Sequence, residues 1–223
     1  MYFTSTMLPN ARYGTMTDKD WQELKLRDPV RMQREDPQAW AQFKDQATYL
    51  FATNKHADRL NIDRMFALGN KVATIQAINS KGAQNFNASD AGGVHNTTLL
   101  SVGTKVMLST NLNTDFGLAN GTIGLVTEII YSPEADPTKD IPKAVLVEFD
   151  GYSGPAFQRN GADVLGPNGG KVVAIGPYSA DWSGGKGQQT KQFKRTGIPL
   201  SPCWAITIHK SQVQLFFTDG YRH

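Results

Sequence analysis

The stretch Cys203-Trp204-Ala205-Ile206-Thr207-Ile208-His209-Lys210-Ser211-Gln212 decides the fold that we expect for this chain. Its first six residues form an apolar run, which is typical of a strand buried in a parallel sheet. The polar residues after the run would lie at the carboxyl edge of the sheet, where ligands bind in open α/β folds. Donors at that edge can reach phosphate groups. A plainer alternative stays open, namely a core strand followed by a polar turn, with His209 as a structural histidine.

A second strand is predicted to run directly into a helix. Residues 48–52 form a short apolar run, Thr53 and Asn54 follow it, and residues 55–68 carry an apolar stripe at helical spacing. Gly69 is a natural residue to end this helix. A strand followed at once by a helix is half of a βαβ unit, so the chain is expected to contain an α/β domain. Residues 72–78 can return as another strand.

The first third of the chain predicts further helices. Thr17 and Asp18 can cap one of them, and Pro29 follows its end. Asp36 is a natural N-cap for another, with Pro37 at the first helical position. Helical structure is therefore expected before the first strand.

Residues 99–198 show no helical period and predict a different kind of structure. Glycine, proline, asparagine and aspartate separate short strand-like runs, and Asn120-Gly121 marks a tight turn. This spacing favours a small antiparallel barrel inserted into the α/β domain. Residues 79–97 and the glycine-rich residues 183–187 are predicted to be loops. The strand-like runs are residues 105–108, 123–131, 144–149 and 171–175.

Composition limits the class of protein. The chain has 223 residues, a net charge of +3 and an isoelectric point near 8.9, so it permits a polyanionic partner without requiring one. Cys203 is the only cysteine, which excludes an intrachain disulfide and favours a reducing compartment: cytoplasm, nucleus or mitochondrion. We expect neither a secretory signal nor a membrane-spanning segment.

Several stretches, in order, resemble the Pif/RecD-like superfamily-one DNA helicases. Residues 205–212 resemble the fifth helicase motif of that family, and residues 50–54, with Asn61 downstream, resemble the fourth. Residues 103–124 resemble the segment that opens the inserted barrel of the family, and residues 147–150 fit a barrel strand. The resemblance covers about residues 10 to 212.

The resemblance implies a RecA-like second motor domain, of the α/β class, with a small SH3-like β-barrel inserted into it. The motor domain would comprise residues 1–98 and 199–212, and the barrel residues 99–198. Residues 213–223 leave the family pattern, so this fold would be incomplete at its C-terminus. In a complete helicase of the family, ATP and Mg²⁺ bind between two motor domains, and unwinding runs 5′ to 3′.

The resemblance also implies roles for individual residues. The fifth motif would contact the backbone of single-stranded DNA through Thr207, His209, Lys210 and Ser211. Gln212 would face the nucleotide, as would Thr53 and Asn54 of the fourth motif. Capping of the helix by Asn54 is the competing interpretation for that last pair. The implied partners are single-stranded DNA and the first motor domain.

The chain lacks several parts that ATP hydrolysis needs. Gly185-Lys186 is followed by Gly187, where a phosphate-binding loop requires serine or threonine. No apolar strand ends in paired acidic residues for Mg²⁺, and the arginine of the sixth motif has no counterpart. We therefore expect no ATP hydrolysis by this chain alone. The alternatives are a non-catalytic nucleic-acid-binding module and a truncated gene product without function.

Other chemistries find no support in the sequence. The four histidines and Cys203 show no metal-ligand spacing. Residues 151–154 lack the spacing of a nucleophile elbow.

Overall fold

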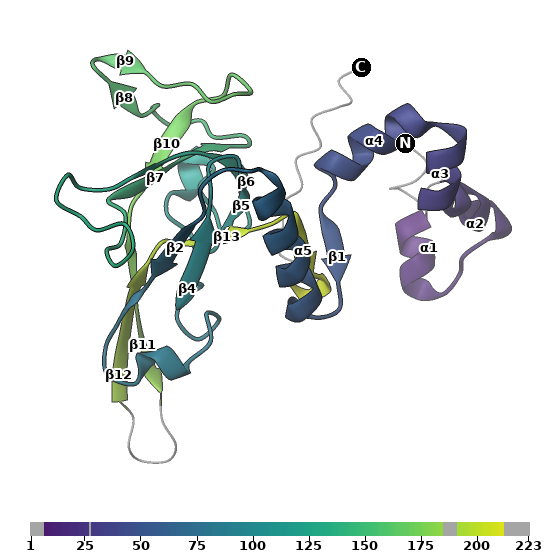
Figure 1. Ribbon diagram of the computed structural model, residues 1–223. Coiled ribbons are helices and arrows are strands. Elements are labelled where there is room, and N and C mark those ends of the chain that lie inside the picture. Colours follow the sequence, from purple (N-terminus) through teal and green to yellow (C-terminus); the bar gives the residue numbers. More distant parts are fainter. Residues whose placement is uncertain (1–6, 27, 185–190, 212–223) are drawn as a thin grey trace. The chain divides into compact units, whose positions relative to one another are not determined.

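The computed structural model describes residues 7–26, 28–184 and 191–211 (Figure 1). The chain divides into two compact units, Met1–Ala47 and Thr48–His223, and each is described by itself. Within the described residues, no helix is long and apolar enough to cross a membrane.

The first unit consists of short helices with well-defined starts. Thr17 caps its helix in a capping box with Asp20, and Asp36 accepts a hydrogen bond from the amide of Ala39, so both predicted helix starts are confirmed. Pro29, expected only to follow a helix, opens one of its own, with Asp28 as its N-cap. The helices are α1 (Leu8–Tyr13), α2 (Asp18–Lys25), α3 (Pro29–Glu35) and α4 (Pro37–Gln46).

The second unit begins with the predicted strand and helix. β1 (Tyr49–Phe51) leads into α5 (Asn54–Ala67), and Gly69 follows the C-cap of α5 in the left-handed conformation with φ of 69°. β14 (Ala205–Thr207) pairs with β1 in parallel. Two parallel strands beside the helix that follows one of them confirm the predicted α/β character.

The end of the fifth-motif stretch differs from the prediction. The strand was expected to continue to Ile208 and to end in a polar turn, but α6 (Ile208–Ser211) begins directly after Thr207. The Ile208 side chain is 49% exposed, so it does not extend the buried strand, and the Ser211 hydroxyl donates to the Ile208 carbonyl across the helical turn. The strand predicted over residues 203–208 therefore began two residues too early and ended one residue too late.

A five-stranded antiparallel sheet forms the main core of the second unit. All four strand-like runs predicted within residues 99–198 lie in it, and Asn120-Gly121 makes the expected tight turn, with Gly121 at φ of 96°. Among the described residues this sheet is open, with β10 and β13 at its edges and no closed barrel. Its order is β10 (Val172–Ile175), β7 (Ala144–Phe149), β6 (Ile123–Ile130), β5 (Lys105–Leu108) and β13 (Leu200–Pro202).

Smaller sheets flank this one (Figure 1). The run expected as one strand over residues 72–78 is split between two sheets. The two-stranded sheets pair β2 (Ala73–Gln76) with β4 (Thr97–Leu100), and β8 (Gln158–Arg159) with β9 (Ala162–Asp163). The three-stranded sheet has the order β11 (Tyr178–Gly184), β12 (Lys191–Gly197) and β3 (Ile78–Asn79). Two short 3-10 helices, η2 (Ala83–Asn85) and η3 (Thr114–Phe116), lie in the connections.

Residues 79–97 are packed into the protein, although the sequence predicted a surface loop. Ala83, Ala91 and Val94 are completely buried there. The reason is Arg195 of β12, whose side chain is also completely buried. Its guanidinium donates to the carbonyls of Ala83, Phe86 and Val94 at 2.6 to 2.9 Å and to the Asn79 side chain at 2.8 Å. One guanidinium thus replaces the regular backbone pairing that this segment lacks.

Replacing Arg195 with leucine should destabilise the protein strongly. Four acceptors would lose their donor at once, and unpaired buried acceptors cost about 1–3 kcal/mol each, so we expect a loss of about 3 kcal/mol or more. Arg159→Leu is the matched control, because the Arg159–Glu128 ion pair is half-exposed and should contribute at most about 1 kcal/mol. Urea unfolding measures both. Equal losses would mean that Arg195 does not organise residues 79–97.

Candidate nucleic-acid interface

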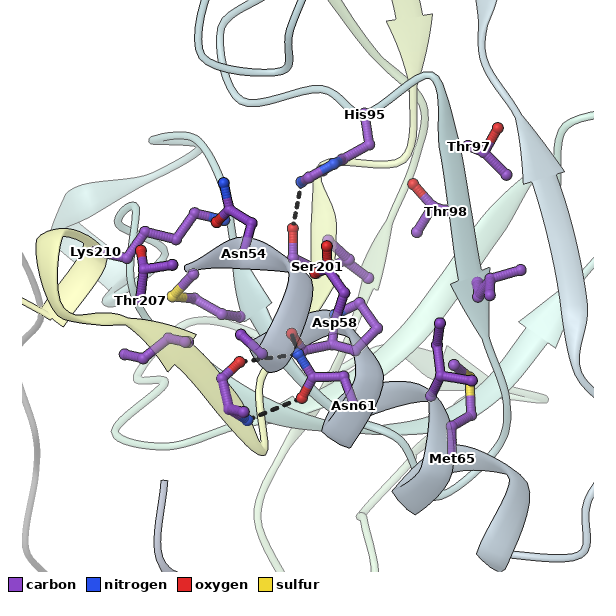
Figure 2. Close-up of a pocket in the computed structure, with 18 residues that line it drawn as sticks. Asn54, Asp58, Asn61, Met65, His95, Thr97, Thr98, Ser201, Thr207 and Lys210 are labelled. Atoms are coloured by element: carbon purple, nitrogen blue, oxygen red, sulfur yellow. Dashed lines mark hydrogen bonds between the residues drawn. The ribbon is translucent and has the colours of Figure 1, made fainter. Parts of the chain in front are cut away.

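The candidate site lies at the carboxyl edge of the parallel pair β1–β14. The register places Phe51 beside Thr207 as the last pair, and each strand then enters a helix. Residues that follow the two strands therefore meet at one edge, although more than 150 positions separate them in the sequence. Figure 2 shows Asn54, Thr207 and Lys210 near one another at this edge. The structure thus brings together residues of the predicted fourth and fifth motifs.

The two fourth-motif residues have different local roles. Thr53 is the N-cap residue of α5, but its hydroxyl lies 2.8 Å from Nδ1 of His56 instead of capping the helix. Asn54 is the first helical residue, so the interpretation of Asn54 as the helix cap is wrong. Asn54 lines the pocket described below, whereas Thr53 does not.

The fifth-motif residues differ in exposure. Thr207 is buried at the end of its strand, while His209 and Lys210 are exposed. Ser211 is half-buried, and its hydroxyl is engaged with the Ile208 carbonyl. The exposed imidazole and ammonium groups are thus the side chains most accessible to a ligand on this edge. Gln212 lies outside the described residues.

Asn61 of α5 holds β14 in place. Its side-chain oxygen accepts from the Ala205 amide at 2.8 Å, and its side-chain nitrogen donates to the Ala205 carbonyl at 2.8 Å and the Pro202 carbonyl at 3.1 Å. One carboxamide therefore pairs the edge of β14 that faces away from β1, as a neighbouring strand would. Asn61 itself is buried. The sequence showed Asn61 only as a residue downstream of the fourth motif.

A pocket of about 260 Å³ opens beside this edge, between α5 and the strands β4, β13 and β14. Six residues of α5 line it, at positions 54, 57, 58, 61, 62 and 65. This spacing defines one face of a helix, and it is a signal that the sequence analysis did not use. The strands contribute Thr97, Thr98, Ser201 and Thr207, among others.

His95 and Ser201 form a hydrogen-bonded pair at the pocket wall (Figure 2). Nε2 of His95 lies 2.9 Å from the Ser201 hydroxyl, and Ser201 is buried. Burial lowers the pKa of His95, and the nearby positive charge of Lys210 lowers it further, while Asp58 acts in the opposite direction. These effects together favour the neutral form of His95. The described residues contain no group of three or more histidine, cysteine, aspartate or glutamate side chains suited to a metal ion.

Comparison with known proteins identifies the relationship. Residues 87–129 match the family model of the 2B domain of DNA helicase Pif1. The ATP-dependent DNA helicase PIF7 of Trypanosoma brucei brucei is 30% identical in an alignment 217 residues long, and this alignment covers 89% of the chain. The chain is similar in sequence to Pif1 helicases. This chain spans 20% of the length of PIF7.

Solved Pif1 structures share the fold. Bacteroides Pif1 in complex with ADP-AlF4 superposes with a TM-score of 0.59 at 21% identity, over 95% of this chain and 40% of that one. Bacteroides Pif1 in complex with ADP-AlF3 and single-stranded DNA gives a TM-score of 0.54 at 19% identity, over 94% of this chain and 40% of that one. The Pif1-like fold thus extends over nearly the whole chain, well beyond the residues that match the 2B model.

Asn61→Ala should destabilise the protein by about 2–4 kcal/mol, because the amide and carbonyl of Ala205 and the carbonyl of Pro202 would lose their partner. Asn70→Ala is the control, since Asn70 donates to the Val102 carbonyl at an exposed position. Chemical denaturation measures both variants. If Asn61→Ala cost no more than Asn70→Ala, the carboxamide would not hold β14.

His95 predicts a pH dependence of stability. Its pKa is lower in the folded than in the unfolded chain, where the ordinary value is 6.5, so the unfolded chain binds the proton more readily. The free energy of unfolding should therefore fall as the pH drops below about 6.5 toward the folded pKa. His95→Gln should flatten this decrease, whereas the same change at exposed His56 should retain it. Urea unfolding between pH 7.5 and pH 5 tests this, and parallel curves for all three proteins would contradict it.

Proposed function

We propose that this chain is part of an ATP-dependent DNA helicase and supplies contacts to the backbone of single-stranded DNA. The observation that carries the proposal is the shared carboxyl edge of β1 and β14. There the exposed His209 and Lys210 lie beside the pocket-lining Asn54 and the buried Thr207. An exposed ammonium group and an exposed imidazole suit phosphate oxygens, whose contacts dominate the affinity of proteins for nucleic acid.

In the proposed assignment, Thr207, His209, Lys210 and Ser211 face the DNA backbone. Thr53, Asn54 and Gln212 form part of one wall of the ATP cleft, and the first motor domain supplies the opposite wall. The chain would then be a RecA-like second motor domain, residues 1–98 and 199–212, with an SH3-like insertion at residues 99–198 and a tail at residues 213–223. Unwinding would run 5′ to 3′. The support is the Pif1-like fold and the parallel strand edge.

ATP and Mg²⁺ belong to the complete helicase in this proposal. The chain by itself should release no phosphate from ATP, because its sequence offers no phosphate-binding loop, no paired carboxylates for Mg²⁺ and no arginine of the sixth motif. Loss of an arginine finger alone costs about a thousandfold or more in turnover. Turnover at a rate ordinary for a helicase would contradict this part of the proposal.

Lys210→Gln tests the backbone contact. Binding of a labelled single-stranded oligonucleotide should weaken, and the slope of log K against log salt should shrink by about one phosphate contact. Lys143→Gln, at an exposed lysine in the loop before β7, is the matched control and should keep the full slope. Fluorescence anisotropy across a salt series measures binding by both variants. His209→Ala, measured in the same way, should weaken binding without changing the melting temperature. Equal slopes for Lys210→Gln and the wild type would refute the assignment of Lys210.

A further inference from the structure

The pocket beside the proposed backbone contact is unlike a phosphate site. Lys210 and Thr207 lie at one end of its lining, and Met65 of α5 lies toward the other end (Figure 2). Among the described residues that line it, Lys210 is the only lysine or arginine, and Asp58 contributes a carboxylate. A carboxylate repels a phosphate group, so the lining away from Lys210 suits an uncharged occupant.

The remaining lining combines apolar surface with hydrogen-bonding groups. Thr97, Thr98 and Ser201 offer hydroxyls, and Asp58 accepts hydrogen bonds. The apolar part consists of side chains from α5, β5, β13 and β14: Ala57, Ile62, Met65, Met107, Leu200, Pro202, Ala205 and Ile206, with Leu99 from β4. A flat heterocycle with polar edges matches both parts of this lining, because its faces are apolar and its rim carries donors and acceptors.

Size and position narrow the occupant further. The volume of about 260 Å³ lies just below the roughly 300–1,000 Å³ of pockets that enclose a drug-sized ligand, so a single ring system fits better than a whole nucleotide. Two of its lining residues, Thr207 and Lys210, are among those proposed to contact the DNA backbone. A base attached to a sugar held at Lys210 is therefore within reach of the interior.

We propose that this pocket receives one unstacked base of the bound single strand while Lys210 contacts the adjoining phosphate. This inference rests on the proposed function, since it requires the strand to lie along the edge of β1 and β14. The pocket would then fix the position of the strand along the protein, because one base is enclosed while its neighbours remain in solvent. Sequence-tolerant binding is expected, since every base presents apolar faces and at least one hydrogen-bond donor or acceptor to the rim.

The test compares two oligonucleotides of equal length and equal phosphate number. One carries natural bases, and the other carries abasic tetrahydrofuran residues in its central half. The whole chain should bind the intact strand about tenfold more tightly, within the range found for single bases held by proteins. Both strands should show a salt-dependent affinity, because both present the same phosphates.

Filling the pocket should abolish this preference. Ala57→Leu places a larger side chain at a buried pocket position on α5, and it should lower the affinity for the intact strand to that for the abasic strand. Ala67→Leu is the matched control, since Ala67 is exposed on the same helix and does not line the pocket. Ile62→Phe fills the pocket from a half-buried position and replaces Ala57→Leu if thermal unfolding shows that the latter does not fold.

The possible outcomes distinguish a failure of the base pocket from a failure of the proposed function. Equal affinity of the wild type for both strands, with a clear salt slope, would overturn the base pocket and leave the proposed function standing. A preference that survives both pocket-filling variants would place the base contacts elsewhere and overturn the assignment. Failure of both strands to bind at low salt would remove the proposed function, and the pocket inference with it.

Discussion

The geometry of the candidate site depends on the carboxamide of Asn61. β14 has only three residues and is paired with β1 along one side. The other side would present an unpaired amide and carbonyl at Ala205, in the interior of the protein, if Asn61 did not pair with both. Thr207 follows Ala205 by two residues. The position of Thr207, and of the helical turn that carries Lys210, is therefore set by a side chain from α5.

The antiparallel sheet supports the same edge from the other direction. β13 is the last strand of that sheet, and the Cys203 amide still donates to the Lys105 carbonyl of β5 before the chain turns into β14. Met107, Cys203 and Ile206 form a small buried cluster at this crossing. Complete burial raises the pKa of the Cys203 thiol to about 12, so the thiol behaves as an apolar packing group. Only a few residues thus separate the five-stranded sheet from the site.

Local signals in the sequence predicted many of the elements. The Asp36-Pro37 helix start, the Asn120-Gly121 turn and the four central strands depend on neighbouring residues, and they were confirmed. The same Asp-Pro signature at Asp28-Pro29 starts α3 and was overlooked. The strand β11 was missed although Tyr178, Ala180 and Trp182 alternate with polar residues, which is the pattern of a half-buried strand. The strand β12 is polar at most positions, and this composition hides the alternation.

The site was only partly predictable, for a related reason. The motif resemblance pointed to Thr207, Lys210 and Asn54, which the structure brings to one edge, while the assigned DNA and nucleotide contacts stay predictions. Other pocket residues come from β4, β5, β13 and the loop before β4, besides those of α5 and β14. Such contacts join positions more than 100 residues apart, as for His95 and Ser201. No local pattern encodes a pairing of that range, since it arises only when separate sheets pack together.

The buried guanidinium of Arg195 has a consequence for the order in which the chain folds. Its four partners precede it by 101 to 116 positions, so these hydrogen bonds can form only after a very long loop has closed. The pairing of β6 with β7 and of β11 with β12 joins much nearer segments and can form early. Residues 79–97 should therefore be among the last parts of the chain to become ordered. During synthesis this region would stay open until β12 has emerged.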